Sequence, residues 1–340
     1  MSNVFGSRTS FKPFVYPWAY EAWLEHEQLH WLSREVGLHE DVRDWNNKLT
    51  KDDIQFLSDT FLLFTQSDID VANGYIKDYL PHFKHPEIRM MLLGFASREA
   101  THIDAYSYLI ETLGKADSFY SEFLKVPVMK EKHDFFENIV NSETDKNSLP
   151  LQIAGISAFT EGMFLFSSFA MLLNYPRQGL MKGMGQIVSW SVLDEQKHVE
   201  GLITLFRTII QENPRLWTDD VKSEIYATAD MMTELEIDFI DHVYKGKEVI
   251  RGLKSEDLKQ YIKYIVDRRL ISLGLKGIHG VKSNALPWID EMIASQNHEN
   301  FFESRATSYA KGALKGTWND VWGKYDGKQE IQTGTGDGIE

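Results

Sequence analysis

The chain has 340 residues, enough for either two domains of ordinary size or one large helical domain. Its net charge of −14 leaves no basic excess to neutralise phosphates, which excludes nucleic acid as the main partner. Cysteine is absent, which excludes disulfides, a thiolate nucleophile and cysteine-ligated metal sites. Since the first ten residues also lack the pattern of a signal peptide, we expect a protein of the reducing cytoplasm.

Helical patterns account for nearly all of the chain. The clearest start is Thr50, a capping residue followed by the acidic first turn of Asp52 and Asp53. No run alternates as a strand, so the expected fold class is all-α. The helices are expected at about 18–35, 51–79, 87–113, 118–140, 150–174, 180–212, 219–244 and 255–273, with a short helix after Pro287.

One segment, residues 153–175, is apolar enough to resemble a membrane span. It carries Glu161 in its interior, however, and a lone carboxylate at bilayer depth is costly. No basic clusters flank the segment to support insertion. The sequence therefore predicts a buried core helix and no membrane partner.

A stripe of three functional groups lies between residues 97 and 108. Glu99, His102 and Tyr106 follow one another at helical spacing, so they share one face of their helix. A carboxylate and an imidazole on one face can hold a metal ion beside the oxidisable phenol. Glu195 and His198 repeat the Glu-x-x-His spacing in a second helix.

Each of these pairs has a lone acidic partner across a helical hairpin. Asp68 lies as far before the turn near residues 80–86 as Glu99 lies after its helix begins, which places them at one height on antiparallel helices. Glu161 and Glu195 flank the turn near residues 174–179 less symmetrically, but within one helical turn. Four carboxylates and two imidazoles in a four-helix bundle form the ligand set of ferritin-like di-iron and di-manganese carboxylate proteins. The sequence predicts two such ions per chain.

Plainer interpretations exist for each residue. Among 50 acidic residues some acid-x-x-His pairs arise by chance, and Glu27 with His30 is a pair without an apolar face or a partner hairpin. Glu161 on its own is equally compatible with a neutral, hydrogen-bonded carboxyl among phenylalanines. Tyr106 on its own is compatible with core packing, as is Tyr108. The register of the two hairpins favours the metal site.

At these residues the chain resembles the small, radical-generating subunit of class I ribonucleotide reductase. The resemblance rests on the order and spacing of the ligand set, over roughly residues 30–200. It implies a ferritin-like helical bundle with additional helices, two ions of iron or manganese or one of each, and a role in deoxyribonucleotide synthesis. It also implies how the ligands divide between the ions: Asp68, Glu99 and His102 bind one, and Glu161, Glu195 and His198 bind the other.

The resemblance further implies roles in radical chemistry. An oxidant such as O₂ would convert Tyr106 into a stable radical, which a route of Trp31, Asp194 and His102 passes to a large subunit that reduces ribonucleotides. Tyr325 is the only candidate for a relay tyrosine in the C-terminal tail. We therefore expect one domain at residues 1–323, a flexible docking tail at 324–340, and a homodimer.

The chain departs from the common family pattern at a few positions. Leu193, directly before Asp194, stands where many members carry arginine. Leu165 and Ser191 stand near the expected radical site, where members often have phenylalanine and an aliphatic residue. The donor types do not distinguish iron from manganese, because oxygen and imidazole ligands suit both.

Functions of other kinds remain possible from the residues. A related di-metal carboxylate oxidase or desaturase would use the metals on a bound organic substrate, and a large apolar tunnel reaching them would favour it. Ferritin-like iron storage needs only about half of this chain length. A metal-free helical scaffold would have to bury Glu161 without a counter-charge.

Overall fold

A computed structural model describes residues 3–8, 10–140 and 148–293, and this part of the chain is almost wholly helical, which confirms the all-α fold class. The α-helices are α1 (Pro17–Glu27), α2 (His39–Asn47), α3 (Lys51–Phe64), α4 (Ser67–Asn73), α5 (Pro86–Thr112), α6 (Pro127–Val140), α7 (Leu149–Ile153), α8 (Leu165–Leu173), α9 (Lys182–Glu212), α10 (Asp219–Tyr244) and α11 (Ser255–Ser272). Two π-helical segments, Gly74–Tyr79 and Ala154–Phe164, continue α4 and join α7 to α8. One hairpin pairs β1 (Val249–Ile250) with β2 (Leu253–Lys254).

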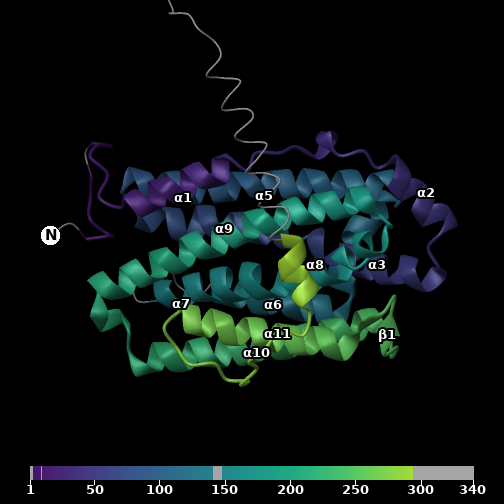
Figure 1. Ribbon diagram of the computed structural model, residues 1–340. Coiled ribbons are helices and arrows are strands. Elements are labelled where there is room, and N and C mark those ends of the chain that lie inside the picture. Colours follow the sequence, from purple (N-terminus) through teal and green to yellow (C-terminus); the bar gives the residue numbers. More distant parts are fainter. Residues whose placement is uncertain (1–2, 9, 141–147, 294–340) are drawn as a thin grey trace, which may run out of the picture. The chain divides into compact units, whose positions relative to one another are not determined.

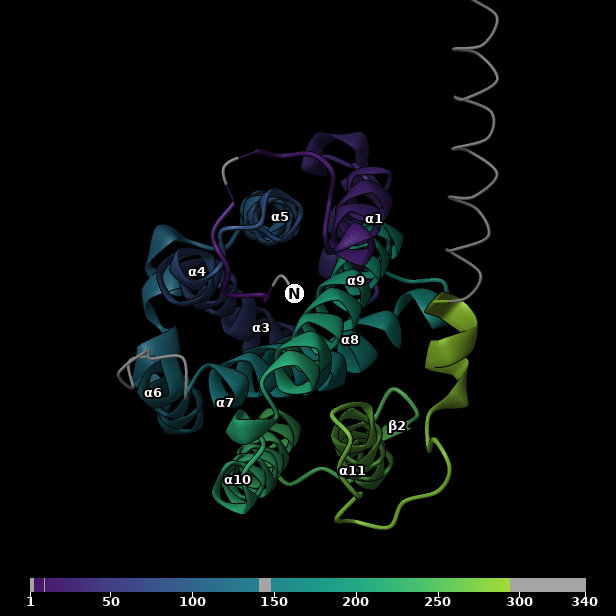
Figure 2. The same ribbon diagram turned by 90° about the vertical axis from the view of Figure 1, so that its left-hand side faces the viewer.

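Four helical stretches form the centre of the bundle. The α4 helix packs on α5, α5 packs on α9, and α9 packs on the π-helical segment Ala154–Phe164. Figure 2 looks along this bundle, with α1 beside α5 and α9 at one side and α10 and α11 at the other. The two ligand-bearing hairpins of the sequence therefore face each other across one core.

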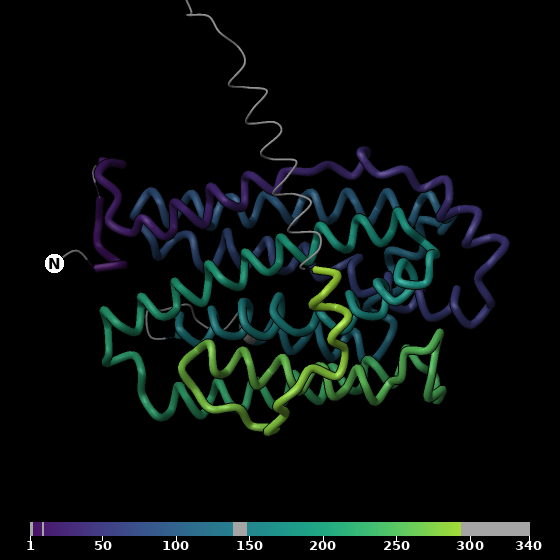
Figure 3. Tube along the Cα trace, viewed as in Figure 1, coloured from purple at the N-terminus to yellow at the C-terminus, as the bar shows by residue number. Residues whose placement is uncertain are grey.

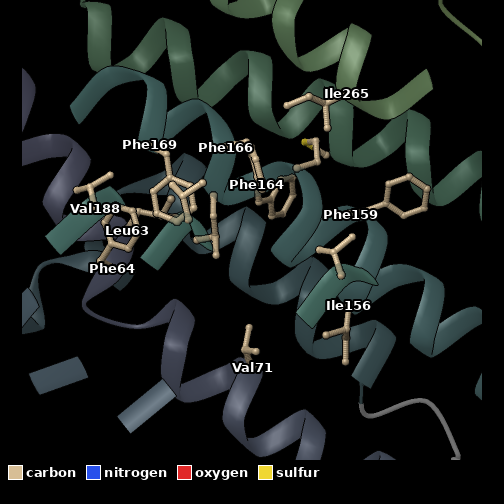
Figure 4. Close-up of a cluster of buried hydrophobic side chains, with 14 of the residues drawn as sticks. Leu63, Phe64, Val71, Ile156, Phe159, Phe164, Phe166, Phe169, Val188 and Ile265 are labelled. Carbon is tan, nitrogen blue, oxygen red and sulfur yellow. The ribbon is translucent and has the colours of Figure 1, made fainter. Parts of the chain in front are cut away.

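The core next to the bundle centre is rich in aromatic side chains. Phe64 of α3 stacks on Phe169 of α8 with ring centroids 5.7 Å apart, and both rings are buried (Figure 4). Burial of one such side chain contributes about 1.5–3 kcal/mol. The helical stretch Leu149–Gln178 is long and apolar enough to pass for a membrane span, but its most apolar window is entirely buried within the protein. It is a core helix, as predicted.

The predicted helix at 18–35 is wrong in its second half. The α1 helix ends at Glu27, and the chain continues as a link that is extended at Leu32 before a short 3₁₀ turn at Ser33–Glu35 (Figure 3). Two tertiary hydrogen bonds favour this link: Trp31 donates to Asp194, and Ser33 donates to Asp104. A continued helix would carry both side chains away from these partners.

Two other predicted helices are interrupted. The helix at 51–79 starts at the expected cap, Thr50, which forms a capping box with Asp53. It breaks after Phe64, where Gln66 leaves helical geometry and donates to Asp70. The helix at 118–140 is shortened to α6, which begins at a proline, a residue favoured in the first helical turn.

Most other helical boundaries agree with the predictions within two residues, and residues 287–293 are helical as expected. The β1–β2 hairpin was not predicted. Its turn residues Arg251 and Gly252 have positive φ angles of 48° and 75°, which is typical of a two-residue hairpin turn. The predicted tail at 324–340, and the domain boundary at 323, lie outside the described residues.

Candidate metal centre

Four elements direct acidic and imidazole side chains into the middle of the bundle, where α4, α5, α9 and the π-helical segment pack on one another. Two of these elements, α5 and α9, lie side by side in Figure 1. Every one of these side chains is at most 2% exposed. They are the six residues predicted as ligands: Asp68 on α4, Glu99 and His102 on α5, Glu161 on the π-helical segment, and Glu195 and His198 on α9.

The imidazole of His198 faces three carboxylates with one nitrogen. Its Nδ1 lies 3.2 Å from Glu99 Oε1, 3.4 Å from Glu161 Oε1 and 3.4 Å from Glu195 Oε2. No hydrogen bond of acceptable geometry satisfies this nitrogen. A single nitrogen surrounded by three carboxylate oxygens is the arrangement of ligands around a shared cation.

The imidazole of His102 repeats this arrangement on the other side of the cluster. Its Nδ1 lies 3.1 Å from Glu99 Oε2 and 3.3 Å from Glu195 Oε1. Glu99 and Glu195 therefore each direct one oxygen towards each imidazole. The donor atoms of Asp68, Glu99 and His102 all lie within 4.8 Å of one another, as do those of Glu99, Glu161, Glu195 and His198.

Unsatisfied buried atoms show that the cluster fits metal ions. Within the part of the chain that the structure describes, four residues each carry a buried side-chain atom without a hydrogen-bond partner: Asp68, Glu99, Glu195 and His198. Buried polar atoms are rarely left unpaired, since each one costs about 1–3 kcal/mol. Oxygen and imidazole donors suit iron or manganese, and four carboxylates balance two divalent ions.

The protonation of the cluster leads to the same conclusion. Burial raises the pKa of the Glu161 carboxyl to about 7, and burial together with the Glu99 carboxylate raises the pKa of Asp68 well above its ordinary value. Burial alone would lower the pKa of His102 and His198, but the facing carboxylates raise both well above the ordinary value. Protons thus balance the charge of these side chains, and metal ions would displace those protons.

The backbone around Glu161 is specialised. Glu161 lies in a π-helical segment, a geometry that is frequent at functional sites. Gly162 follows it at a close approach: a Cβ there would lie 2.8 Å from Arg269 Nε, which donates to the carbonyl of Gly162. Tyr75, from the other π-helical segment, donates to both oxygens of Glu161, 2.7 and 2.9 Å away.

On the outer side of His102 lies a chain of hydrogen bonds. His102 Nε2 is 3.2 Å from Asp194 Oδ2, and the indole N–H of Trp31 donates to the same oxygen over 2.8 Å. The Trp31 ring also stacks on the imidazole of His102, with centroids 6.0 Å apart. The structure thus brings together the three residues that the resemblance assigns to radical transfer.

Tyr106 lies one helical turn after His102 on α5. Its side chain is 2% exposed, its ring stacks on Phe64 at 4.2 Å, and its hydroxyl forms no hydrogen bond of acceptable geometry with the described residues, although Ser191 lies close enough to influence its pKa. Burial raises the pKa of this phenol well above its ordinary value. Leu165 and Ser191 are both buried, at 3% and 1% exposure.

Other candidate residues lie apart from the cluster. Glu27 and His30 are exposed, which agrees with the interpretation that their spacing arose by chance. Asp70 and His133 approach Glu137 closely enough for a cation, but a 2.8 Å hydrogen bond between Asp70 and His133 accounts for their contact. Tyr325 lies outside the described residues.

Three residues around the centre were not predicted: Tyr75, His26 and Arg98. His26 Nε2 lies 3.2 Å from His198 Nε2 and 3.6 Å from Asp194 Oδ1. Arg98 Nη1 lies 3.1 Å from Asp194 Oδ1. Only Tyr75 had a sequence signal, because it follows Asp68 by two helical turns on the same face.

Comparisons with known proteins agree with this geometry. The family model described as "Ribonucleotide reductase, small chain" matches residues 8–286. A probable ribonucleoside-diphosphate reductase small subunit of Invertebrate iridescent virus 6 is 44% identical, over 93% of this chain and 98% of that protein. The ribonucleoside-diphosphate reductase subunit beta of Chlamydia pneumoniae is 31% identical, over 87% and 88% of the two chains.

Solved structures show the same fold at lower sequence identity. The ribonucleotide reductase R2 subunit from Clostridium botulinum has a TM-score of 0.78 at 22% identity, covering 84% of this chain and 91% of that one. The dimanganese(II) NrdF protein of Streptococcus sanguinis has a TM-score of 0.74 at 17% identity, covering 84% of this chain and 99% of that one.

Proposed function

Because this chain belongs to the family of ribonucleotide reductase small chains, we propose that its buried cluster holds two metal ions that drive the oxidation of Tyr106. The chain is an oxidoreductase subunit of ribonucleoside-diphosphate reductase, and its function depends on a large-subunit partner. The proposal concerns the site residues and the radical chemistry.

The six buried side chains are the proposed metal ligands. The observation that carries this assignment is His198 Nδ1, which lies within 3.4 Å of oxygens from Glu99, Glu161 and Glu195 without forming a hydrogen bond. Small subunits of this class carry a dinuclear metal site, and the cluster has the donors for one. Iron, manganese or a mixed pair are all compatible with these ligands. One structural neighbour is a dimanganese protein, so we consider manganese as well as iron as the bound metal.

Metal ions held by these six side chains would supply, together with an oxidant such as O₂ or superoxide, the one-electron oxidation. Tyr106 would give up one electron and its phenolic proton to that oxidising centre. The surroundings of Tyr106 suit a persistent radical, because its ring is buried against Phe64 and shielded from solvent.

Trp31 and Asp194 supply the proposed route for the radical away from His102. The shared oxygen Asp194 Oδ2 joins the indole N–H of Trp31 to His102 Nε2, so an electron and a proton can move along one connected set of groups. We also propose that Tyr325 relays the radical through the tail, that the chain forms a homodimer, and that it acts in the cytoplasm. These three points rest on the family resemblance alone.

The relay is tested by mixing the chain with its large subunit and measuring ribonucleoside diphosphate reduction. Trp31→Phe should abolish reduction yet keep the Tyr106 radical, because it removes only the connection to Asp194. Trp45→Phe is the matched control, since Trp45 is also buried but stacks on Phe61. Full reduction by Trp31→Phe would overturn the assigned route.

A di-metal oxidase that acts on an organic substrate would need a large cavity at the metal centre, and the cavity beside the centre is small. That cavity measures about 40 Å³ and lies among Leu63, Phe136, Phe164 and Leu165. It is large enough for a water molecule or two and too small for an organic substrate. None of the six proposed ligands lines it.

A further inference from the structure

Arg98 lies immediately before the proposed ligand Glu99, but it points away from the metal cluster. Its side chain is 6% exposed, and its Nη1 donates to Asp194 at 3.1 Å from Oδ1 and 3.3 Å from Oδ2. Asp194 is itself 1% exposed. A buried carboxylate needs a cation or several donors, and Arg98 supplies the cation here.

The same guanidinium binds the backbone of the segment that carries Trp31. Arg98 Nη1 donates to the carbonyl of Leu29 at 2.9 Å, and Nη2 lies 3.3 Å from the carbonyl of His26. These carbonyls lie at the end of α1, where the helix stops and the chain turns towards Trp31. Arg98 therefore binds the side chain of Asp194 directly, and through the carbonyls of Leu29 and His26 it binds the backbone of the segment just before Trp31.

The position of this arginine explains a departure in the sequence. Leu193 stands where the family resemblance leads one to expect arginine, and Leu193 is buried at 3% exposure. Asp194 nevertheless has an arginine partner, which comes from α5 instead of from its own helix α9.

We propose that Arg98 is the positioning residue of the relay: it fixes the Asp194 carboxylate and the backbone of His26 and Leu29, just before Trp31, so that the Trp31–Asp194–His102 contacts form. His26 also lies next to the Asp194 carboxylate: its Nε2 is 3.6 Å from Asp194 Oδ1 and 3.2 Å from His198 Nε2. Arg98 and His26 both lie beside Oδ1, while Oδ2 lies 2.8 Å from the indole nitrogen of Trp31, 3.2 Å from His102 Nε2 and 3.3 Å from Arg98 Nη1. This inference rests on the proposed relay function of Trp31.

The test uses the full-length chain, labelled with ¹⁵N at tryptophan, and follows the indole N–H signal of Trp31 by NMR. Trp31→Phe identifies the signal. In Arg98→Ser we expect the indole proton to shift towards its unbonded position and to exchange faster with water. Nucleotide reduction with the large subunit should fall about 10- to 100-fold, the range typical of residues that support a metal centre from outside. The Tyr106 radical, measured by EPR, should remain.

Two further variants separate positioning from simple loss of stability. Arg98→Ser combined with Leu193→Arg returns a guanidinium next to Asp194, and it should restore both the indole signal and nucleotide reduction. Arg89→Ser is the control: Arg89 lies on the same helix but donates only to the carbonyls of Leu80 and Phe83. This control should leave the Trp31 signal unchanged.

An unchanged Trp31 signal in Arg98→Ser would overturn the proposal, as would a folded double variant that recovers nothing. If Arg98→Ser does not fold, Arg98→Lys takes its place: it keeps the charge but loses the paired contacts, so the same shift is expected. The two proposals can fail separately. If the relay is wrong, the Trp31→Phe variant will still support nucleotide reduction. The NMR comparison of Arg98→Ser with the unmodified chain decides the role of Arg98 in either case.

Discussion

The phenol of Tyr75 donates to both carboxylate oxygens of Glu161, over 2.7 and 2.9 Å. Tyr75 is 1% exposed and Glu161 is fully buried. This contact joins the two π-helical segments of the chain across the candidate metal centre. It gives a buried carboxylate one donor and orients it towards His198, whose Nδ1 is 3.4 Å from Glu161 Oε1.

Replacing Tyr75 should therefore weaken metal binding. In Tyr75→Phe, Glu161 loses its orienting donor, and we expect the affinity for the metal held by Glu161 to fall about 10- to 100-fold. Chelator competition with Mn(II) measures this directly. Tyr79→Phe is the matched control, because Tyr79 is equally buried in the same segment but donates to the carbonyl of Gln152. Equal affinities in the two variants would contradict the assignment.

Metal content should depend on which carboxylate is removed. Glu99 faces both imidazoles, at 3.1 Å from His102 and 3.2 Å from His198, so Glu99→Ala should lose both ions. Asp68 groups only with Glu99 and His102, so Asp68→Ala should lose one ion and keep the other. Elemental analysis after loading and desalting gives the count.

Glu27→Ala is the control for this count, because Glu27 is the exposed member of the chance Glu-x-x-His pair. It should keep the full metal content of the unmodified chain. Identical metal content in Asp68→Ala and Glu99→Ala would mean that Glu99 is not shared between the two ions.

The Asp53–Arg251 pair gives a pH dependence of stability away from the metals. Arg251 donates to both oxygens of Asp53, at 2.9 Å and 2.8 Å. Burial alone would raise the pKa of Asp53, but hydrogen bonds from Arg251 and Thr50 hold it below the ordinary value of 3.8. A depressed carboxyl pKa stabilises the fold above pH 3.8, and this contribution is lost as the pH falls through the folded pKa.

In the metal-free chain, Asp53→Asn should lower the free energy of unfolding by about 1–3 kcal/mol at neutral pH. The difference from the unmodified chain should shrink as the pH falls below 3.8, where the native carboxylate also becomes protonated. Urea unfolding at several pH values measures it. Asp52→Asn, whose side chain is 67% exposed, should show little effect at any pH. A difference that stays constant with pH would contradict the pKa argument.

The ligand geometry was predictable because it depends on local rules. Glu99 with His102, and Glu195 with His198, share helix faces through their spacing alone, and the turns between helices set the heights of Asp68 and Glu161. The structure brings these six residues together even though the helix carrying Asp68 breaks after Phe64. The break was not predicted because a tertiary contact, Gln66 with Asp70, outweighs helix propensity there.

The supporting residues could not be predicted because their contacts are distant in the sequence. The bonds of Tyr75 to Glu161, Arg98 to Asp194 and His26 to His198 span 86, 96 and 172 residues. Helical spacing places Tyr75 on the face of Asp68, but no periodicity or motif identifies the partner of any of these three residues. The same holds for the end of α1, which depends on the Trp31–Asp194 bond across 163 residues.

The central claim is that the metal centre oxidises Tyr106. EPR of the full-length chain after loading with iron or manganese and aerobic activation tests it most directly. The account predicts a tyrosyl signal near the free-electron g value, lost in Tyr106→Phe and kept in Tyr108→Phe, whose half-buried phenol lies 3.4 Å from the carbonyl of Val36. A tyrosyl signal that survives in Tyr106→Phe, or bound metals without any organic radical in the unmodified chain, would contradict it.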